Sequence, residues 1–152
     1  MNSKQIQLII LACAIGLIYF IYQLPTYVIE NKNSKEEMQK AVSVEQALAL
    51  IEGANPMEGV FMLRDIVENN PQDTEAIYYL GVLSNQTGQY ENAAKRFNQL
   101  ITIDSSDKRA YLQLGISNYN LGNKEKADSL FNIIRNSEDK LLIEELDNFL
   151  TN

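Results

Sequence analysis

The sequence contains no histidine and only one cysteine, Cys13. Without histidine the chain cannot assemble a Ser-His-Asp or Cys-His nucleophile system, and zinc sites built from cysteine and histidine are excluded as well. A single cysteine cannot form an internal disulfide. Cys13 lies inside an apolar stretch, where a thiol behaves as a small hydrophobic group. The most familiar nucleophilic and zinc chemistries are therefore ruled out.

Basic residues are also few, with 13 Lys and Arg against 20 Asp and Glu and a formal net charge of -7. A chain this acidic is repelled by phosphate backbones, so nucleic acid is not expected as a partner. Carboxylates are plentiful, but a catalytic pair needs a shared cleft, and the adjacent acids here lie on polar helix faces or in linkers. We therefore predict a protein that is not an enzyme, with no catalytic, cofactor-binding or metal-binding residues and no cofactor.

The first part of the chain holds a long uncharged stretch, residues 6–24. As a helix with a rise of about 1.5 Å per residue it would span about 28 Å, the thickness of the hydrocarbon core of a bilayer. We predict a transmembrane helix over 6–24, preceded by a flank at 1–5. A cleaved signal peptide and a lipoprotein signal with residues 10–13 (ILAC) as its lipobox are the alternatives. A retained anchor is favoured because no small-residue cleavage site follows and the residues after Cys13 are apolar.

Residues 25–40 are polar and charged, and we expect them to form a juxtamembrane linker that holds the rest of the chain clear of the headgroups. The very short flank before the apolar stretch favours a cytoplasmic N-terminus and an exported domain. In a bacterium with two membranes, the protein would then be a single-pass inner-membrane protein with a periplasmic domain. Lysines stand on both sides of the stretch, so the positive-inside rule discriminates weakly and a cytoplasmic domain stays open as the alternative.

The second half of the chain repeats itself with a period of 34 residues. The matching pairs are Leu80 and Leu114, Gly81 and Gly115, Gly88 and Gly122, Ala93 and Ala127, and Phe97 and Phe131. Apolar residues in each half-repeat recur at helical spacing, which is typical of amphipathic helices. The glycine and alanine pairs would let two helices approach closely, and Gly88 and Gly122 would supply the left-handed turn that ends a helix.

This pattern resembles the tetratricopeptide-repeat (TPR) family, whose repeat runs aromatic, Leu-Gly, turn glycine, small residue, aromatic and closing proline. A weaker first repeat has Gly59, Leu63 and Pro71 at the small, large apolar and proline places. The resemblance implies an all-α fold, a helix-turn-helix solenoid of about three repeats plus a C-terminal cap helix, which would follow the N-terminal transmembrane helix predicted above. Its expected parts are a degenerate repeat at 41–73, repeats at 74–107 and 108–139, and a cap helix at 140–152 that covers the last repeat.

The resemblance also implies a partner-binding groove lined by the first helix of each repeat. Carried over to this sequence, the groove residues are Glu75, Tyr78, Val82, Asn85 and Gln86 from one repeat, and Arg109, Leu112, Ile116, Tyr119 and Asn120 from the next. Glu45, Ala49 and Glu52 would extend the groove into the first repeat. The alternative is that Val82, Leu112 and Ile116 are buried between repeats.

Tyr78, Val82 and Leu112 stand where TPR domains that hold acidic chaperone tails place Lys, Asn and Arg, so that ligand class is not expected. A groove of this composition favours an amphipathic helix or an extended apolar segment.

Two functions from different classes remain. The favoured one is a membrane-anchored scaffold or adaptor that binds other proteins, as an accessory subunit or chaperone of an export or envelope-assembly complex. The alternative is a structural subunit of a larger membrane complex that docks mainly through residues 6–24, with the repeats as a spacer. Fold resemblance does not choose between them, because one architecture hosts many roles.

Overall fold

The computed structural model describes residues 43–151. Within this range the chain is all-α, with helices joined by short turns and no strand. A helical segment at 43–52 precedes α2 (Pro56–Asn69), α3 (Thr74–Gln86), α4 (Tyr90–Ile103), α5 (Lys108–Asn120), α6 (Lys124–Arg135) and α7 (Lys140–Thr151). The predicted transmembrane helix and juxtamembrane linker lie outside the described residues. Of the helices within residues 43–151, none has the length and apolar character needed to cross a bilayer.

Three helices begin in the same way, with an aspartate at the N-cap. Asp73 accepts a hydrogen bond from the backbone N–H of Ala76 at the start of α3. Asp107 does so for α5, and Asp139 accepts from two N–H groups in the first turn of α7. An aspartate at this position satisfies backbone donors that have no partner within the helix. The cap helix α7 therefore starts like the first helix of a further repeat.

The turns inside the second and third repeats are closed by glycine in the left-handed region. Gly88 has φ 74° and Gly122 has φ 81°. The backbone N–H of Gln89 donates to the carbonyl of Ser84 across the end of α3, which is the six-to-one bond of a Schellman motif. Asn123 makes the equivalent bond to Asn118 at the end of α5. The predicted left-handed turns are thus confirmed at both positions.

Close helix contacts depend on the paired glycines. A Cβ atom added to Gly81 would lie 2.6 Å from Cζ of Phe97, and one added to Gly115 would meet the ring of Phe131. Both phenylalanine side chains are fully buried. Each ring therefore fills the space that its glycine leaves open, as the 34-residue spacing predicts.

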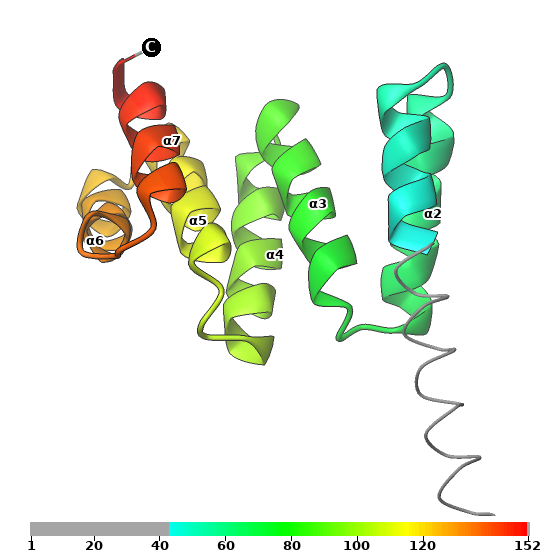
Figure 1. Ribbon diagram of the computed structural model, residues 1–152, viewed down its shortest axis with the longest axis horizontal. Helices are drawn as coiled ribbons and strands as arrows, with labels where there is room; N and C mark the ends of the chain where they lie inside the picture. The colour runs from blue at the N-terminus through cyan, green and yellow to red at the C-terminus, as the bar shows by residue number, and fades with distance from the viewer. Residues whose placement is uncertain (1–42, 152) are drawn as a thin grey trace, which may run out of the picture. The chain divides into compact units, whose positions relative to one another are not determined.

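The core is divided into three clusters, and each cluster joins neighbouring helices. The first links the segment 43–52, α2 and α3, the second links α3, α4 and α5, and the third links α5, α6 and α7. Figure 1 shows α2 to α7 succeeding one another across the domain. No helix pair encloses a core by itself, so each repeat depends on its neighbours, which is the defining property of a solenoid.

Candidate functional site

The first helices of successive repeats, α3 and α5, pack beside each other, and α7 packs next to α5. A hollow of about 400 Å³ opens between these three helices. Its lining consists of Val82, Asn85, Gln86, Tyr90, Gln113, Ile116, Asn120, Glu145 and Phe149. Apolar side chains from each of the three helices thus alternate with amide groups. We call this hollow, together with the side chains around it on α3, α5 and α7, the groove.

A row of polar side chains crosses the groove from one helix to the next. The amide of Asn85 on α3 donates to both the backbone carbonyl and the side-chain oxygen of Gln113 on α5, each at 3.1 Å. Ser117 donates to the Asn85 oxygen at 2.8 Å. Gln113 in turn donates to Glu145 on α7 at 2.8 Å. Gln113 and Ser117 are buried, and burial of such groups is tolerated because each has a hydrogen-bond partner.

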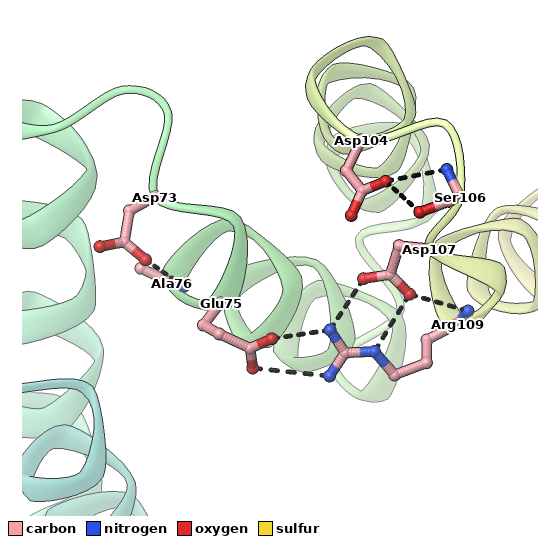
Figure 2. Close-up of polar contacts among 7 residues, drawn as sticks. All are labelled: Asp73, Glu75, Ala76, Asp104, Ser106, Asp107 and Arg109. Carbon is pink, nitrogen blue, oxygen red and sulfur yellow. Dashed lines mark hydrogen bonds and ion pairs between the residues drawn. The ribbon is translucent and has the colours of Figure 1, made fainter. Parts of the chain in front are cut away.

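Arg109 is the centre of a second polar group, shown in Figure 2. Its guanidinium donates to Asp107 from Nε at 3.0 Å and from Nη2 at 2.8 Å. It also donates to Glu75 on the preceding repeat, from Nη2 at 2.7 Å and from Nη1 at 3.5 Å. The same guanidinium lies 4.5 Å from the ring centroid of Tyr78, which is cation–π geometry. Three residues predicted for the groove are therefore brought together here: Glu75, Tyr78 and Arg109.

The surroundings of this group shift two pKa values. The hydrogen bonds that Arg109 donates to Asp107 and Glu75 raise its pKa above its already high value, so the guanidinium stays charged. Burial raises the pKa of Tyr78 to about 12, with Glu145 and Asp107 adding to the shift and Arg109 opposing it. Tyr78 is therefore a neutral hydroxyl over the whole physiological range. Because Arg109 already has two carboxylate partners, a third carboxylate from a ligand would have to displace one of them.

The predicted groove residues do not all face the same space. Val82, Asn85, Gln86, Ile116 and Asn120 line the hollow. Leu112 is fully buried against α6 and α7, so for this residue the buried alternative holds. Tyr119 is 41 % exposed and packs edge-on against Phe149 at 5.4 Å between ring centroids.

The proposed extension of the groove concerns the first helical segment. The side chains of Glu45, Ala49 and Glu52 are exposed along residues 43–52. They do not contribute to the hollow, whose lining comes from α3, α4, α5 and α7.

Four lining residues of the hollow were not predicted from the sequence: Tyr90, Gln113, Glu145 and Phe149. A signal for Glu145 was present, because it follows the capping residue Asp139 by six positions, just as Gln113 follows Asp107. The prediction that α7 is only a cap helix gave no reason to compare Glu145 with Gln113. Phe149 carries no comparable signal, because its place at the hollow depends on how α7 lies across α5.

Two carboxylates of the groove already have partners within the protein. Glu75 is paired with Arg109, and Glu145 accepts a hydrogen bond from Gln113. In the part of the chain that the structure describes, no three His, Cys, Asp or Glu side chains are grouped in a way that would hold a metal ion. The groups that the groove presents are apolar surface and amide hydrogen-bonding groups.

Comparison with known families and structures agrees with this architecture. Residues 81–122 match the family model described as TPR repeat, and residues 109–138 match the one described as tetratricopeptide repeat. No curated protein sequence matches the chain. Among solved structures, the chain is similar to the second TPR of Spaghetti (RPAP3) bound to the HSP90 peptide SRMEEVD. The TM-score is 0.58 at 15% identity, over 66% of this chain and 94% of that one. The chain therefore contains tetratricopeptide repeats, and its described part has the corresponding fold.

Proposed function

We propose that this protein is a scaffold that binds a segment of another protein in the groove on α3, α5 and α7. Tetratricopeptide repeats imply a role in protein–protein interaction, and the similar solved structure holds a peptide. The observation that carries the proposal is the hollow of about 400 Å³ with apolar walls and amide groups. Pockets that combine an apolar lining with a few convergent polar groups are the usual form of a binding site.

The chemistry of the groove favours an amphipathic helix or an extended apolar segment as the partner. Val82, Ile116 and Phe149 offer apolar contact, while Gln86 and Asn120 can meet backbone groups of a bound segment. The cation in the groove, Arg109, is occupied by its own carboxylates. None of the described residues that line the hollow carries a positive charge that could attract an acidic tail.

We further propose that residues 6–24 anchor the scaffold in a membrane. The support is the uncharged apolar sequence alone, since these residues lie outside the described range. In this proposal the repeats are exported and serve an export or envelope-assembly complex of a bacterial inner membrane. Activity of alkaline phosphatase fused after Asn152 would support this orientation, and fluorescence of a cytosolic reporter fused there would contradict it.

Co-purification of the full chain in mild detergent tests the binding site. We expect the Val82→Ala/Ile116→Ala variant to lose its partner, because apolar anchors in a groove each contribute about 2 kcal/mol or more to binding. The matched control is Phe61→Ala/Ile133→Ala, which truncates two exposed apolar side chains outside the groove, 53% and 42% exposed. This control should retain the partner. Circular dichroism of each variant shows whether it remains folded.

The same experiment separates the two functional classes. If the folded groove variant binds its partner as tightly as the parent chain, the groove is not the binding site. Loss of the partner only when residues 6–24 are replaced by an unrelated apolar helix would then favour the structural-subunit alternative, in which the anchor does the docking.

A further inference from the structure

A second cleft lies between α2 and α4, away from the groove. Its volume is about 290 Å³. It is lined by Met57, Val60 and Arg64 from α2, by Leu80, Leu83, Ser84 and Thr87 from α3 and its end, and by Gln89, Asn92 and Arg96 from the start of α4. The floor is apolar and the rim is polar, with two arginines among the lining residues.

These two arginines, Arg64 and Arg96, have no ion-pair partner in the part of the chain that the structure describes, whereas Arg109 forms two ion pairs. Arg96 is half-buried, and its pKa is lowered by burial and by the nearby charge of Arg64. Arg64 lies over the ring of Phe61, 5.8 Å from its centroid. Two like charges beside one cleft, in a chain of net charge -7, are an unfavourable arrangement until an anion joins them.

Solenoid packing does not require the arginine pair. One repeat later, at an offset of 34 residues, the positions of Arg64 and Arg96 are occupied by Asn98 and Leu130. The helices at that later position stack with the same period and the same glycine–phenylalanine contact. The arginine pair is therefore a local feature of the cleft between α2 and α4. The packing of the repeats does not account for it.

We propose that this cleft binds an acidic peptide segment of a partner protein, with carboxylates on Arg64 and Arg96 and an adjacent apolar side chain on the floor. Guanidinium groups bind carboxylates through paired, charge-assisted hydrogen bonds. Val60 and Leu83 supply the apolar contact, and the cleft volume matches one or two side chains rather than a whole domain. This site goes beyond the scaffold function proposed above, because it uses another face of α3 and a ligand of opposite chemistry.

Fluorescence anisotropy of labelled peptides on the full chain in an uncharged detergent tests the proposal. The probe is the capped peptide Gly-Ser-Glu-Leu-Glu-Glu-Leu-Ser-Gly, and its partner has Gln in place of each Glu. We expect the Glu peptide to bind the parent chain and the Gln peptide not to bind. Each arginine replaced by glutamine should weaken binding about tenfold or more. The charge-matched control, Lys124→Gln/Arg135→Gln on α6, should bind like the parent chain.

A second measurement separates ligand binding from a structural role. Without peptide, Arg64→Gln in a Phe61→Ala background should raise the melting temperature, because it removes the repulsion of Arg96 when no contact with the Phe61 ring is left to lose. A fall in melting temperature would make Arg64 a stabilising residue and overturn the proposal.

Equal binding of the Glu and Gln peptides, or unchanged binding by both Arg64→Gln and Arg96→Gln, would overturn it too. The proposal would also be overturned if inorganic phosphate displaced the Glu peptide fully and if a Glu peptide with Ser in place of each Leu bound as tightly as the original. The cleft would then be a site for free anions. Loss of peptide binding here leaves the groove test unaffected, since the two use different residues.

Discussion

The contact between Gly81 and Phe97 allows a quantitative test of the helix packing. An added Cβ at Gly81 would lie 2.6 Å from Cζ and 2.7 Å from Cε1 of the Phe97 ring. The ring is fully buried and packs edge-on against Tyr78 at 6.1 Å between centroids, so it has little room to withdraw. Overpacking of this kind costs about 1–3 kcal/mol. Alanine in place of glycine inside a helix gains about 1 kcal/mol, so Gly81→Ala alone should be neutral or destabilising by up to about 2 kcal/mol.

A double-mutant cycle isolates the steric part. Leucine at position 97 lacks the three ring atoms that the new Cβ would meet, Cζ, Cε1 and Cε2. In the Phe97→Leu background, Gly81→Ala should therefore show only its helix-propensity gain of about 1 kcal/mol. The two backgrounds should differ by about 1–3 kcal/mol, which is within the range observed for residues in contact. Urea denaturation of the full chain in detergent, followed by far-ultraviolet circular dichroism, measures each corner of the cycle.

Gly88 provides the control for this cycle. Its φ of 74° penalises alanine, but a Cβ there would meet no atom within 4 Å. Gly88→Ala should therefore cost about 1–2 kcal/mol equally with phenylalanine or leucine at position 97. If Gly81→Ala has the same effect in both backgrounds, the ring does not occupy the space beside Gly81 and the assigned helix pairing is wrong.

Three further predictions concern single features. Tyr78 titrates at about 12 when folded, against about 10 when unfolded, so its contribution to stability is complete below pH 10 and is lost as pH rises toward 12. In urea titrations between pH 10 and 12, the free energy of unfolding should therefore fall less for Tyr78→Phe than for the parent chain. An equal fall in the two proteins would contradict the raised pKa of Tyr78. Asp107→Ala should lower the free energy of unfolding by about 1 kcal/mol, because α5 loses its N-cap. Asp104→Ala, in the exposed turn before α5, should lower it by less. Intact mass of the membrane fraction should show residues 6–24 retained, and a lipid on Cys13 or a chain that starts after residue 20 would refute the anchor.

The repeat architecture was predictable because it depends on residues whose roles are local. Gly88 and Gly122 end their helices through their own backbone conformation. Gly81 and Phe97 lie at a fixed spacing on two helices of one repeat, so their contact follows from the period. In the first segment, Val44 and Ala47 are buried three residues apart, as an amphipathic helix requires. These inferences need only helical geometry and a count along the chain.

The composition of the groove was only partly predictable. Val82, Asn85 and Ile116 were placed by the resemblance to tetratricopeptide repeats, and they do line the hollow. Leu112 has the same period but is covered by α7, and that depends on where the helix after the last repeat lies. The arginines of the second cleft lie 32 residues apart on α2 and α4, outside the 34-residue register. Long-range placements of this kind depend on the angles between helices, which no single sequence pattern encodes.

The row of hydrogen bonds from Asn85 through Gln113 to Glu145 has a consequence for how the domain opens. Detachment of α7 would remove the acceptor of the Gln113 side-chain N–H group and would expose Leu112 to water at the same moment. In a solenoid, stability is approximately the sum of terms for each repeat and coupling terms between neighbours. The hydrogen bond and the shared core couple α7 to α5, and we expect a segment bound in the groove to strengthen this coupling because it would contact both helices. Such a segment should therefore slow hydrogen exchange of the α7 amides together with those of α5.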